Sequence, residues 1–306
     1  MGVRTALVGA GRMGRLHLRA LGRTEAVRLV GVVDPAPAAR REVAAQGFPA
    51  YASVAELLAA GRVEAAVVAT PTPTHLDLVR VLAAAGVAVL CEKPCGLTEE
   101  EARLAGEAAA AAGVVLQVGY WRRFVPSLAR LRGRIAAGEL GTVVQVHCAQ
   151  WDARPPSADF LRESGGILVD MGVHEFEMLR WLTGQEVVAA TGFASAGGPG
   201  PVVPGDRESV GLALALSAGA VGLVSLGRRF PPGDAAWVRV IGTDGVEVVS
   251  FLEPPGGEEA LVRALVAQAE AFAAAVRGGP LRGATAEDAR AALAAAAHAA
   301  DGMRDA

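Results

Sequence analysis

Three closely spaced glycines near the N-terminus constrain the fold more than any other feature of this sequence. The segment Gly9-Ala10-Gly11-Arg12-Met13-Gly14 follows an apolar run that predicts a strand over 5–8, and it opens a predicted helix over 13–21. Glycines at this spacing let the backbone turn tightly, approach a pyrophosphate and present amide N–H groups at the positive end of a helix. The segment therefore predicts a strand–turn–helix unit that binds a phosphate-bearing ligand.

A carboxylate at the end of the next predicted strand sharpens this prediction. Residues 29–33 predict a strand that is followed by Asp34, and a carboxylate there can accept hydrogen bonds from an adenosine ribose. The alternative is a glycine-rich turn in which Asp34 only caps the following segment. We predict dinucleotide binding, with NAD as the cofactor, because a carboxylate repels the 2′-phosphate of NADP. Arg40 and Arg41 lie downstream and keep NADP as the second candidate.

The first 120 residues alternate short β-branched runs with longer segments rich in Ala, Leu and Arg. Strands are predicted over 5–8, 29–33, 65–69, 87–90 and 114–118, and helices over 13–21, 38–46, 54–60, 75–85 and 99–112. This alternation is typical of βαβ units on a parallel sheet. We predict an α/β chain whose N-terminal domain, residues 1–120, is a Rossmann doubly wound parallel sheet.

The pattern changes after Tyr120. Helices over 125–137 and 167–182, a strand over 141–149 and a proline-rich loop over 154–157 precede a series of strand-like runs. Turns between these runs are predicted at 197–200, 218–219, 231–233 and 243–245, a loop at 197–205, and helices over 258–277 and 285–301 close the chain. Residues 121–306 therefore predict a second, α+β domain with a large, mostly antiparallel, open sheet.

Composition excludes several classes of protein. The 306 residues are 52% hydrophobic and 20% charged, with a formal net charge of −3, so we expect a folded two-domain chain that does not bind nucleic acid. Three cysteines, Cys91, Cys95 and Cys148, are too few for a disulfide framework or a zinc site, which fits a reducing cytoplasm and no metal.

Membrane insertion and secretion are not expected either. The N-terminus lacks a cleavage-site pattern. The uncharged stretch 209–227 alternates large and small residues around a Ser-Ala-Gly turn, which indicates a buried hairpin and not a membrane span.

Two loops after neighbouring predicted strands carry candidate chemistry. In an open α/β sheet the ligand crevice lies beyond the carboxyl ends of the strands, so Thr70-Pro71-Thr72-Pro73-Thr74-His75 can border a nicotinamide ribose. The alternative is a proline-stiffened turn capped by Thr74. In Cys91-Glu92-Lys93-Pro94, the Lys93 ammonium can bind a substrate hydroxyl and lower the pKa of a neighbouring acid/base group. The alternative there is a surface salt bridge.

A third candidate lies in the second domain. Asp170 and His174 are four residues apart in a predicted helix, and a carboxylate at that spacing can orient an imidazole that transfers a proton. The same stripe continues to Met178 and Trp181, so the alternative is a polar pair at the border of a buried face.

Taken in order, these motifs resemble the Gfo/Idh/MocA family of oxidoreductases, and within it the inositol 2-dehydrogenase-like branch. The motifs that carry the resemblance are GAGRMG, VVD, TPTPTH, CEKP, GYWRRF and GGILVDMGVHEFEMLRWLTG, over about residues 5–184. The combination of EKP with GG-x-x-x-D-x-x-x-H is specific, whereas neither motif alone would be.

The resemblance implies a catalytic set of Lys93, Asp170 and His174. His174 would take a proton from a substrate hydroxyl, Asp170 would orient His174, and Lys93 would bind the hydroxyl oxygen while a hydride passes to the nicotinamide. The residues expected to bind the cofactor are Gly9, Ala10, Gly11, Arg12, Met13, Gly14, Asp34, Thr70, Pro71, Thr72, His75, Glu92, Lys93 and Arg122. Arg122 is expected on the cofactor or substrate side, and Trp121 is expected to shape the pocket.

The sequence departs from the family pattern in ways that bear on the substrate. Thr72 stands where many relatives have asparagine, and no tyrosine follows Tyr120, although inositol dehydrogenases often carry one near residues 231–234. Asp152, Arg154 and Asp159 are candidates to replace polar contacts, or else ordinary loop charges. A cyclic polyol or sugar is thus the expected substrate class, with myo-inositol as one candidate.

Three functions stay open at this point. The first is an NAD-dependent dehydrogenase of a secondary alcohol, the second a redox-neutral, NAD-using glycoside hydrolase, and the third a nicotinamide-binding sensor without catalysis. In the family the face of the second sheet pairs between subunits, so the resemblance implies a homodimer or homotetramer.

Overall fold

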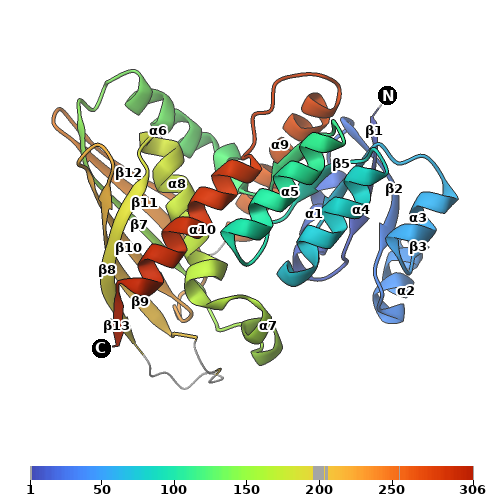
Figure 1. Cartoon of the computed structure of the whole chain (residues 1–306), viewed down its shortest axis with the longest axis horizontal. Coiled ribbons are helices and arrows are strands. Elements are labelled where there is room, and N and C mark those ends of the chain that lie inside the picture. Colours follow the sequence, from blue (N-terminus) through green and yellow to red (C-terminus); the bar gives the residue numbers. More distant parts are fainter. Residues whose placement is uncertain (1, 196–202, 204–205, 255, 306) are drawn as a thin grey trace. The chain divides into compact units, whose positions relative to one another are not determined.

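The computed structural model describes residues 2–195, 203, 206–254 and 256–305. The chain divides into two compact units. The first comprises Met1–Trp121 and Val262–Arg290, and the second Arg122–Leu261 and Ala291–Ala306. Figure 1 labels the elements of both units.

The first unit contains a six-stranded sheet in the order β3-β2-β1-β4-β5-β6, with every paired strand parallel. Its strands are β1 (Val3–Val8), β2 (Val27–Val33), β3 (Ala50–Tyr51), β4 (Ala65–Val68), β5 (Ala88–Cys91) and β6 (Leu116–Val118). The helices are α1 (Arg12–Leu21), α2 (Pro37–Ala45), α3 (Val54–Ala60), η1 (Thr72–Thr74), α4 (His75–Ala84), α5 (Glu99–Ala111), α9 (Gly257–Val276) and the start of α10 (Ala286–Asp301). The predicted Rossmann sheet is confirmed, and its strand order reverses between β1 and β4, where such folds bind ligands.

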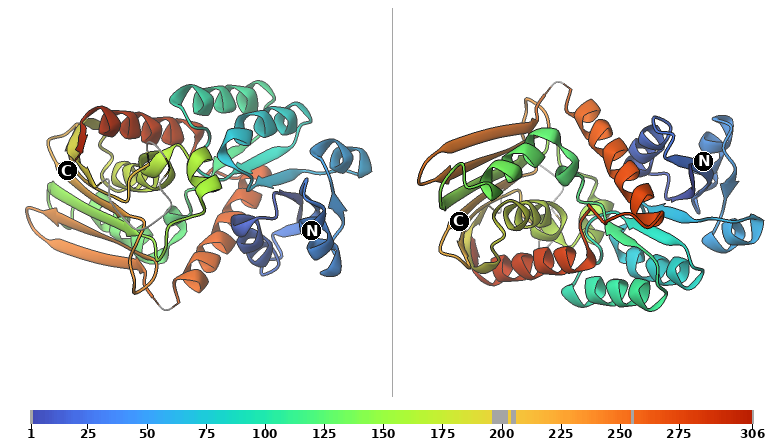
Figure 2. Two further views of the ribbon diagram at one scale, coloured as in Figure 1. Left: turned by 90° about the horizontal axis from the view of Figure 1, so that it is seen from below. Right: turned by 90° about the horizontal axis from the view of Figure 1, so that it is seen from above.

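Burial explains why the central strands read as continuous apolar runs. Every residue of β4 and β5 is buried, as expected when helices cover both faces of a parallel sheet. One face packs Leu7 and Val67 against Leu21 of α1 and Phe272 of α9. Figure 2 shows α9 on the side of α1, with α4 and α5 on the opposite side.

The helix α9 is where the structure differs from the predicted domain division. The prediction placed residues 258–277 in the second domain, but Ala269, Phe272 and Ala273 belong to the core of the first sheet. Thr24 also donates a hydrogen bond to Glu270 at 2.9 Å. An amphipathic pattern shows that a helix has an apolar face, but it does not show which sheet covers that face.

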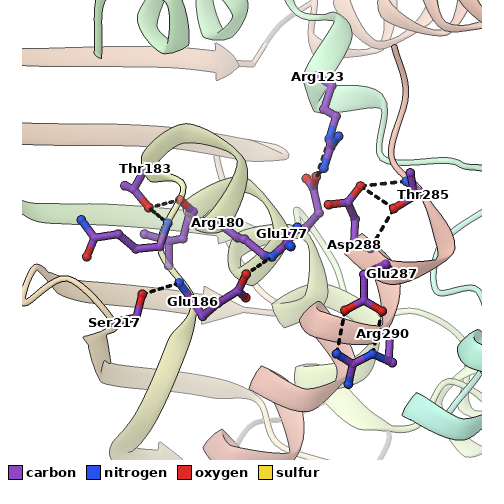
Figure 3. A network of polar contacts seen from close by, with 12 residues as sticks. Arg123, Glu177, Arg180, Thr183, Glu186, Ser217, Thr285, Glu287, Asp288 and Arg290 are labelled. Atoms are coloured by element: carbon purple, nitrogen blue, oxygen red, sulfur yellow. Dashed lines mark hydrogen bonds and ion pairs between the residues drawn. The ribbon is translucent and has the colours of Figure 1, made fainter. Parts of the chain in front are cut away.

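Side-chain caps set the start of several helices. Thr98 Oγ1 accepts the Glu101 N–H at the start of α5, and Ser157 Oγ accepts the Phe160 N–H at the start of α7 (Ala158–Glu163). Before α10, Thr285 and Asp288 exchange hydrogen bonds that satisfy each other's backbone N–H groups (Figure 3).

The second unit contains a seven-stranded sheet in the order β12-β11-β7-β10-β9-β8-β13. Its strands are β7 (Val143–Trp151), β8 (Val187–Ser195), β9 (Ser209–Leu216), β10 (Val221–Gly227), β11 (Ala235–Gly242), β12 (Val246–Leu252) and β13 (Met303–Asp305). Only the β7/β10 and β8/β13 pairs are parallel. The helices are η2 (Trp121–Phe124, from its second residue on), α6 (Pro126–Ala136), α7, η3 (Leu168–Gly172) and α8 (Val173–Thr183). The predicted α+β domain with a mostly antiparallel sheet is confirmed.

The stretch 209–227 forms the predicted hairpin. Strands β9 and β10 are antiparallel, with Ala215 opposite Val221, and Gly219 has a φ of 92° in the connecting turn. Within the described ranges, no helix combines the length and the apolar composition that a membrane crossing requires. Most of the predicted loop 197–205 lies outside the described residues.

The two faces of the second sheet differ. Val210, Leu212, Leu214 and Leu216 of β9 are buried on the face that α8 covers. The opposite face, here called the outer face, carries three rows of cross-strand neighbours. These rows are Phe193-Gly211-Ser225-Ala149-Trp237-Ser250, Thr191-Ala213-Leu223-His147-Arg239-Val248 and Ala189-Ala215-Val221-Gln145-Ile241-Val246. Among these side chains Arg239 carries the permanent charge, and Phe193, Val221, Val246 and Val248 are exposed.

Candidate active site

In the turn between β1 and α1, each of the three glycines is surrounded differently. Gly9 has a φ of 95°, and a Cβ there would lie 2.6 Å from the Ala69 carbonyl oxygen. A Cβ at Gly14 would lie 2.1 Å from the Gly9 carbonyl oxygen, so this glycine permits close packing of helix on strand. At Gly11 a Cβ would meet nothing within 4 Å. The open position at Gly11 is therefore where a ligand's phosphates can reach the amides of α1.

Asp34 is held beside this turn. Its Oδ2 accepts the Ala10 N–H at 2.9 Å, and its Oδ1 accepts the Ala36 N–H at 2.8 Å. The structure thus brings the predicted ribose-binding carboxylate to the glycine turn. The Arg40 guanidinium lies close by, because its Nη1 donates to the carbonyls of Asp34 at 2.8 Å and Pro35 at 2.7 Å.

Within the turn itself the remaining predicted residues differ in exposure. Ala10 is buried and contributes its backbone N–H to Asp34, whereas Arg12 is exposed at the start of α1 and Met13 is half-buried. Gly11 has no side chain to cap α1, so the first amides of the helix are open to an anionic ligand.

His75 joins the two loops that follow β4 and β5. The ring is buried, with Nδ1 at 2.7 Å from the Pro94 carbonyl oxygen and Nε2 at 2.9 Å from that of Thr70. Burial lowers the pKa of His75, while the two carbonyl contacts oppose the shift. The hydroxyls of Thr70 and Thr74 lie 2.7 Å apart, and η1 exposes Pro71 and leaves Thr72 half-buried. His75 therefore fixes the shape of the loops, and the threonine side chains lie nearer to solvent.

Glu92 and Lys93 follow β5 directly, before a cis Lys93-Pro94 peptide bond. The Glu92 carboxylate is buried, and its Oε1 lies 2.6 Å from Nε2 of His17 on α1. Its Oε2 accepts the Lys93 N–H at 3.2 Å. His17 is completely buried and was missed by the sequence analysis, because a single histidine in a helix of Arg and Leu shows no pairing with a residue 75 positions away.

Replacing His17 with leucine is expected to destabilise the first unit by about 3–5 kcal/mol, because it leaves the Glu92 carboxylate buried without its partner. Replacing Glu92 with methionine in the same chain should recover much of this loss, since two apolar groups then fill the site. Arg15→Gln is the matched control, because the Arg15–Glu42 pair on the same helix is exposed. Urea unfolding followed by circular dichroism measures the effect. Equal midpoints for His17→Leu and Arg15→Gln would contradict it.

The cysteines do not have the character of nucleophiles. All three are buried and free. A hydrogen bond with Cys95 and burial raise the pKa of the Cys91 thiol, and burial raises that of Cys148. Among the residues that the structure describes, no cluster of three or more His, Cys, Asp or Glu side chains is arranged to hold a metal ion.

Asp170 and His174 lie in the second unit, on either side of a change in helix type. Asp170 is in η3, a π-helical turn, and His174 is in the first turn of α8, and both residues are buried. The prediction of one continuous helix is corrected in this respect. Short π-helical turns often occur at functional sites. Asp170 Oδ2 accepts a hydrogen bond from Arg228 at 3.1 Å. The sequence analysis did not include Arg228.

Arg122 is held by protein groups of the second unit. Its Nη1 donates to Glu175 at 2.7 Å, its Nη2 donates to Gln150 at 2.6 Å, and its guanidinium lies over the Phe251 ring. Burial raises the pKa of Glu175, and the Arg122 charge opposes that rise. This arginine therefore anchors η2 to α8 beside His174.

A second buried pair repeats this anchoring. Arg123 donates to Glu177 at 2.5 Å, and Figure 3 shows the two side chains pointing toward each other. Further along α8, Arg180 donates to Glu186 at 2.6 Å.

The predicted catalytic residues come from both units: Lys93 from the first, and Asp170 and His174 from the second.

Comparison with known proteins identifies the class. The family description "Oxidoreductase family, NAD-binding Rossmann fold" matches residues 3–120, and "GFO/IDH/MocA C-terminal domain" matches residues 128–247. The two matches together cover most of the chain and define an oxidoreductase, and relatives named inositol dehydrogenases indicate the class that acts on CH–OH groups. The chain belongs to the Gfo/Idh/MocA family.

Individual relatives and solved structures agree with this assignment. The chain is 50% identical over 296 residues to the rhizopine catabolism protein MocA of Rhizobium meliloti, covering 95% of this chain and 92% of the relative. It is 34% identical to an inositol 2-dehydrogenase of R. meliloti strain 1021, covering 83% and 77%.

Among solved structures, a putative myo-inositol dehydrogenase from Sinorhizobium meliloti has 31% identity and a TM-score of 0.89, covering 98% and 97%. GenD2 from gentamicin A biosynthesis, solved in complex with NAD, has 28% identity and a TM-score of 0.89, covering 98% of this chain and 94% of GenD2.

Proposed function

We propose that this protein is an NAD-dependent dehydrogenase that transfers a hydride from a secondary hydroxyl-bearing carbon of a cyclic polyol or sugar to the nicotinamide. The observation that carries the proposal is the presence of Lys93, Asp170 and His174 together in a chain 34% identical to an inositol 2-dehydrogenase. The name of the 50% identical relative points to a rhizopine-degrading pathway as one physiological context.

The proposed mechanism assigns one task to each residue. His174 accepts the proton of the reacting hydroxyl, and Asp170, one turn earlier, orients the imidazole and stabilises the imidazolium that forms. The Lys93 ammonium binds the hydroxyl oxygen and favours its deprotonation. NAD, held by the first unit, would supply the hydride acceptor for the carbinol carbon.

The first unit suits a dinucleotide. The open position at Gly11 and the uncapped amides of α1 would receive the pyrophosphate, and Asp34 would accept hydrogen bonds from the adenosine ribose. Thr70, Pro71, Thr72, Glu92 and Lys93 are proposed to border the nicotinamide half. For His75, Glu92 and Arg122 the proposed contribution is to position these loops and η2, since their polar atoms already bind protein groups.

Asp34→Ser is expected to reduce the preference for NAD over NADP by about 30-fold or more, because a hydrogen bond to a charged group contributes about 1.5–3 kcal/mol. The substitution also removes the charge that repels a 2′-phosphate, next to the Arg40 guanidinium. The ratio of kcat/KM values for the two cofactors measures the effect. Arg40→Met in the Asp34→Ser background should then lower NADP use. An unchanged ratio in Asp34→Ser would exclude Asp34 from cofactor selection.

We also propose that the protein is a homo-oligomer and that its outer face, as defined above, forms the contact. This face combines exposed Phe193, Val221, Val246 and Val248 with few permanently charged side chains, namely Arg239 and, at the edge beside Phe193, Arg304. Apolar faces of this kind are usually covered in solution.

A reducing cytoplasm is the proposed compartment, in accord with three free cysteines.

Val221→Glu is expected to convert the oligomer to a monomer, since it would bury an unpaired charge in the contact. Val81→Glu is the matched control, because Val81 is an exposed valine of α4 in the first unit. Light scattering at working concentration measures the mass. A monomeric wild-type protein, or an unchanged mass for Val221→Glu, would refute the proposed contact.

A further inference from the structure

Asp170 is part of a buried charge network that extends beyond the residues predicted from the sequence. Arg228 directly follows β10 and is 1% exposed. Its Nη1 donates to Asp170 Oδ2 at 3.1 Å, its Nη2 donates to Asp206 Oδ1 at 3.0 Å, and its Nε lies 2.8 Å from Asp206 Oδ2. One guanidinium therefore holds two carboxylates from distant parts of the second unit.

Asp206 ties this network to the start of the π-helical turn. Its Oδ1 accepts the backbone N–H of Ile167 at 2.9 Å, one residue before η3 begins. Arg228 consequently contacts Asp170 directly and also contacts the residue that anchors the first turn. Both contacts lie within the second unit.

The charges of the network do not cancel. Burial lowers the pKa of Arg228, but the two aspartates outweigh this effect and raise it, so Arg228 is charged at all working pH values. These three side chains carry one positive and two negative formal charges, and Asp170 lies four residues before His174 in the first turn of α8.

Several other charged residues on and beside this helix form ion pairs. Glu175 and Glu177 of α8 pair with Arg122 and Arg123 of η2. Arg229, next to Arg228, pairs with Glu208. These pairs and the Asp170–Arg228–Asp206 group are the ion pairs that the structure gives on and beside α8 in the second unit.

We propose that Arg228 is a positioning residue that holds the Asp170 carboxylate, and that Arg228 and Asp206 together set the protonation equilibrium of His174. The inference rests on the proposed function, in which Asp170 supports His174 as the proton acceptor. Buried Arg228 takes one oxygen of Asp170 and offsets part of its charge. Without that offset, Asp170 would stabilise the imidazolium form of His174 more strongly.

The sign of each substitution follows from this arrangement. Arg228→Met removes the positive charge, so the titration midpoint of His174 should rise by about one pH unit. Asp206→Asn leaves Arg228 with less neutralisation, so the midpoint should fall. Arg228→Lys keeps the charge but loses the two-sided contact, and it should restore most of the midpoint. Arg229→Met is the matched control, because Arg229 is an arginine of the same segment with a different partner.

The experiment is an NMR titration of histidine ring nitrogens in the ¹⁵N-labelled full chain, with the His174 signal assigned by its loss in His174→Gln. Opposite shifts in Arg228→Met and Asp206→Asn, with no shift in Arg229→Met, would support the proposal. Unchanged midpoints, or shifts of the same sign in both variants, would overturn it. If Arg228→Met does not fold, a lowered midpoint in Asp206→Asn together with a near wild-type midpoint in Arg228→Lys would support the proposal, and an unchanged midpoint in Asp206→Asn would overturn it.

A second readout separates this inference from the proposed function. In active protein, the acid limb of the pH profile of kcat/KM should move with the NMR midpoint in each variant. A wild-type protein that oxidises no polyol would refute the proposed function, while the NMR midpoints would still decide whether Arg228 and Asp206 act on His174.

Discussion

His174→Asn is expected to lower kcat/KM for polyol oxidation by about 10²–10⁴-fold, because a positioned proton acceptor typically contributes a factor of this size. Asparagine keeps the polar character and approximate shape of the side chain but cannot accept the hydroxyl proton at neutral pH. NAD affinity should be unchanged, because the glycine turn and Asp34 belong to the first unit and His174 to the second. Initial rates of NADH formation and the dissociation constant of NAD separate the two effects.

The matched control for this prediction is His298→Asn, an exposed histidine near the end of α10. Its rate should equal that of the wild-type protein. Turnover retained in His174→Asn with an unchanged pH dependence would show that another group accepts the proton, and would remove His174 from the mechanism.

Gly11→Val is expected to weaken NAD binding by at least about 100-fold, or about 2.8 kcal/mol, while leaving stability almost unchanged. A side chain at Gly11 meets no protein atom within 4 Å, and the residue has a φ of −70°, which valine can adopt. The added side chain would instead occupy the space through which a pyrophosphate approaches the α1 amides. Calorimetric titration with NAD and thermal unfolding of the free protein measure the two quantities.

Gly61→Val serves as the control for that substitution. Gly61 ends α3 in extended backbone, with a φ of 169°, and a Cβ there also meets nothing within 4 Å. It should bind NAD normally. Equal NAD affinities for Gly11→Val and wild type would show that phosphates do not approach the chain at this turn. Gly14→Val, by contrast, should reduce stability, because its Cβ would lie 2.1 Å from the Gly9 carbonyl oxygen.

Local sequence patterns were sufficient for five of the six strands of the first sheet and for its glycine turn, but the two-residue strand β3 was not predicted. The spacing of Gly9, Gly11 and Gly14 is set by steric requirements of one turn, and Asp34 ends the adjacent strand, so both features are readable along the chain. The hairpin 209–227 was equally readable, because alternation with period two and a glycine turn are local properties.

Side-chain pairs between residues far apart in the sequence could not be predicted. His17 binds Glu92 across 75 residues, and Arg228 binds Asp170 across 58 residues. The local pattern of apolar and polar residues does not predict which buried acidic side chain will pair with which buried basic one. The packing of α9 on the first sheet was missed for the same reason. The sequence of α9 indicates that Phe272 is on its apolar face, but not which of the two sheets that face contacts. The sequence therefore suggested candidate reacting residues, which stay a prediction, but not the buried residues His17 and Arg228 that contact Glu92 and Asp170.

The most direct test of the account is NADH formation by the purified protein with NAD across a panel of inositols, aldoses and sugar acids, with Lys93→Ala in parallel. We expect NADH with at least one cyclic polyol or sugar, and its loss in Lys93→Ala with NAD binding retained. No NADH from any of these compounds, with NAD still bound tightly, would contradict the dehydrogenase. It would favour a redox-neutral glycoside hydrolase if sugar is released from glycosides, or a nicotinamide-binding sensor if it is not.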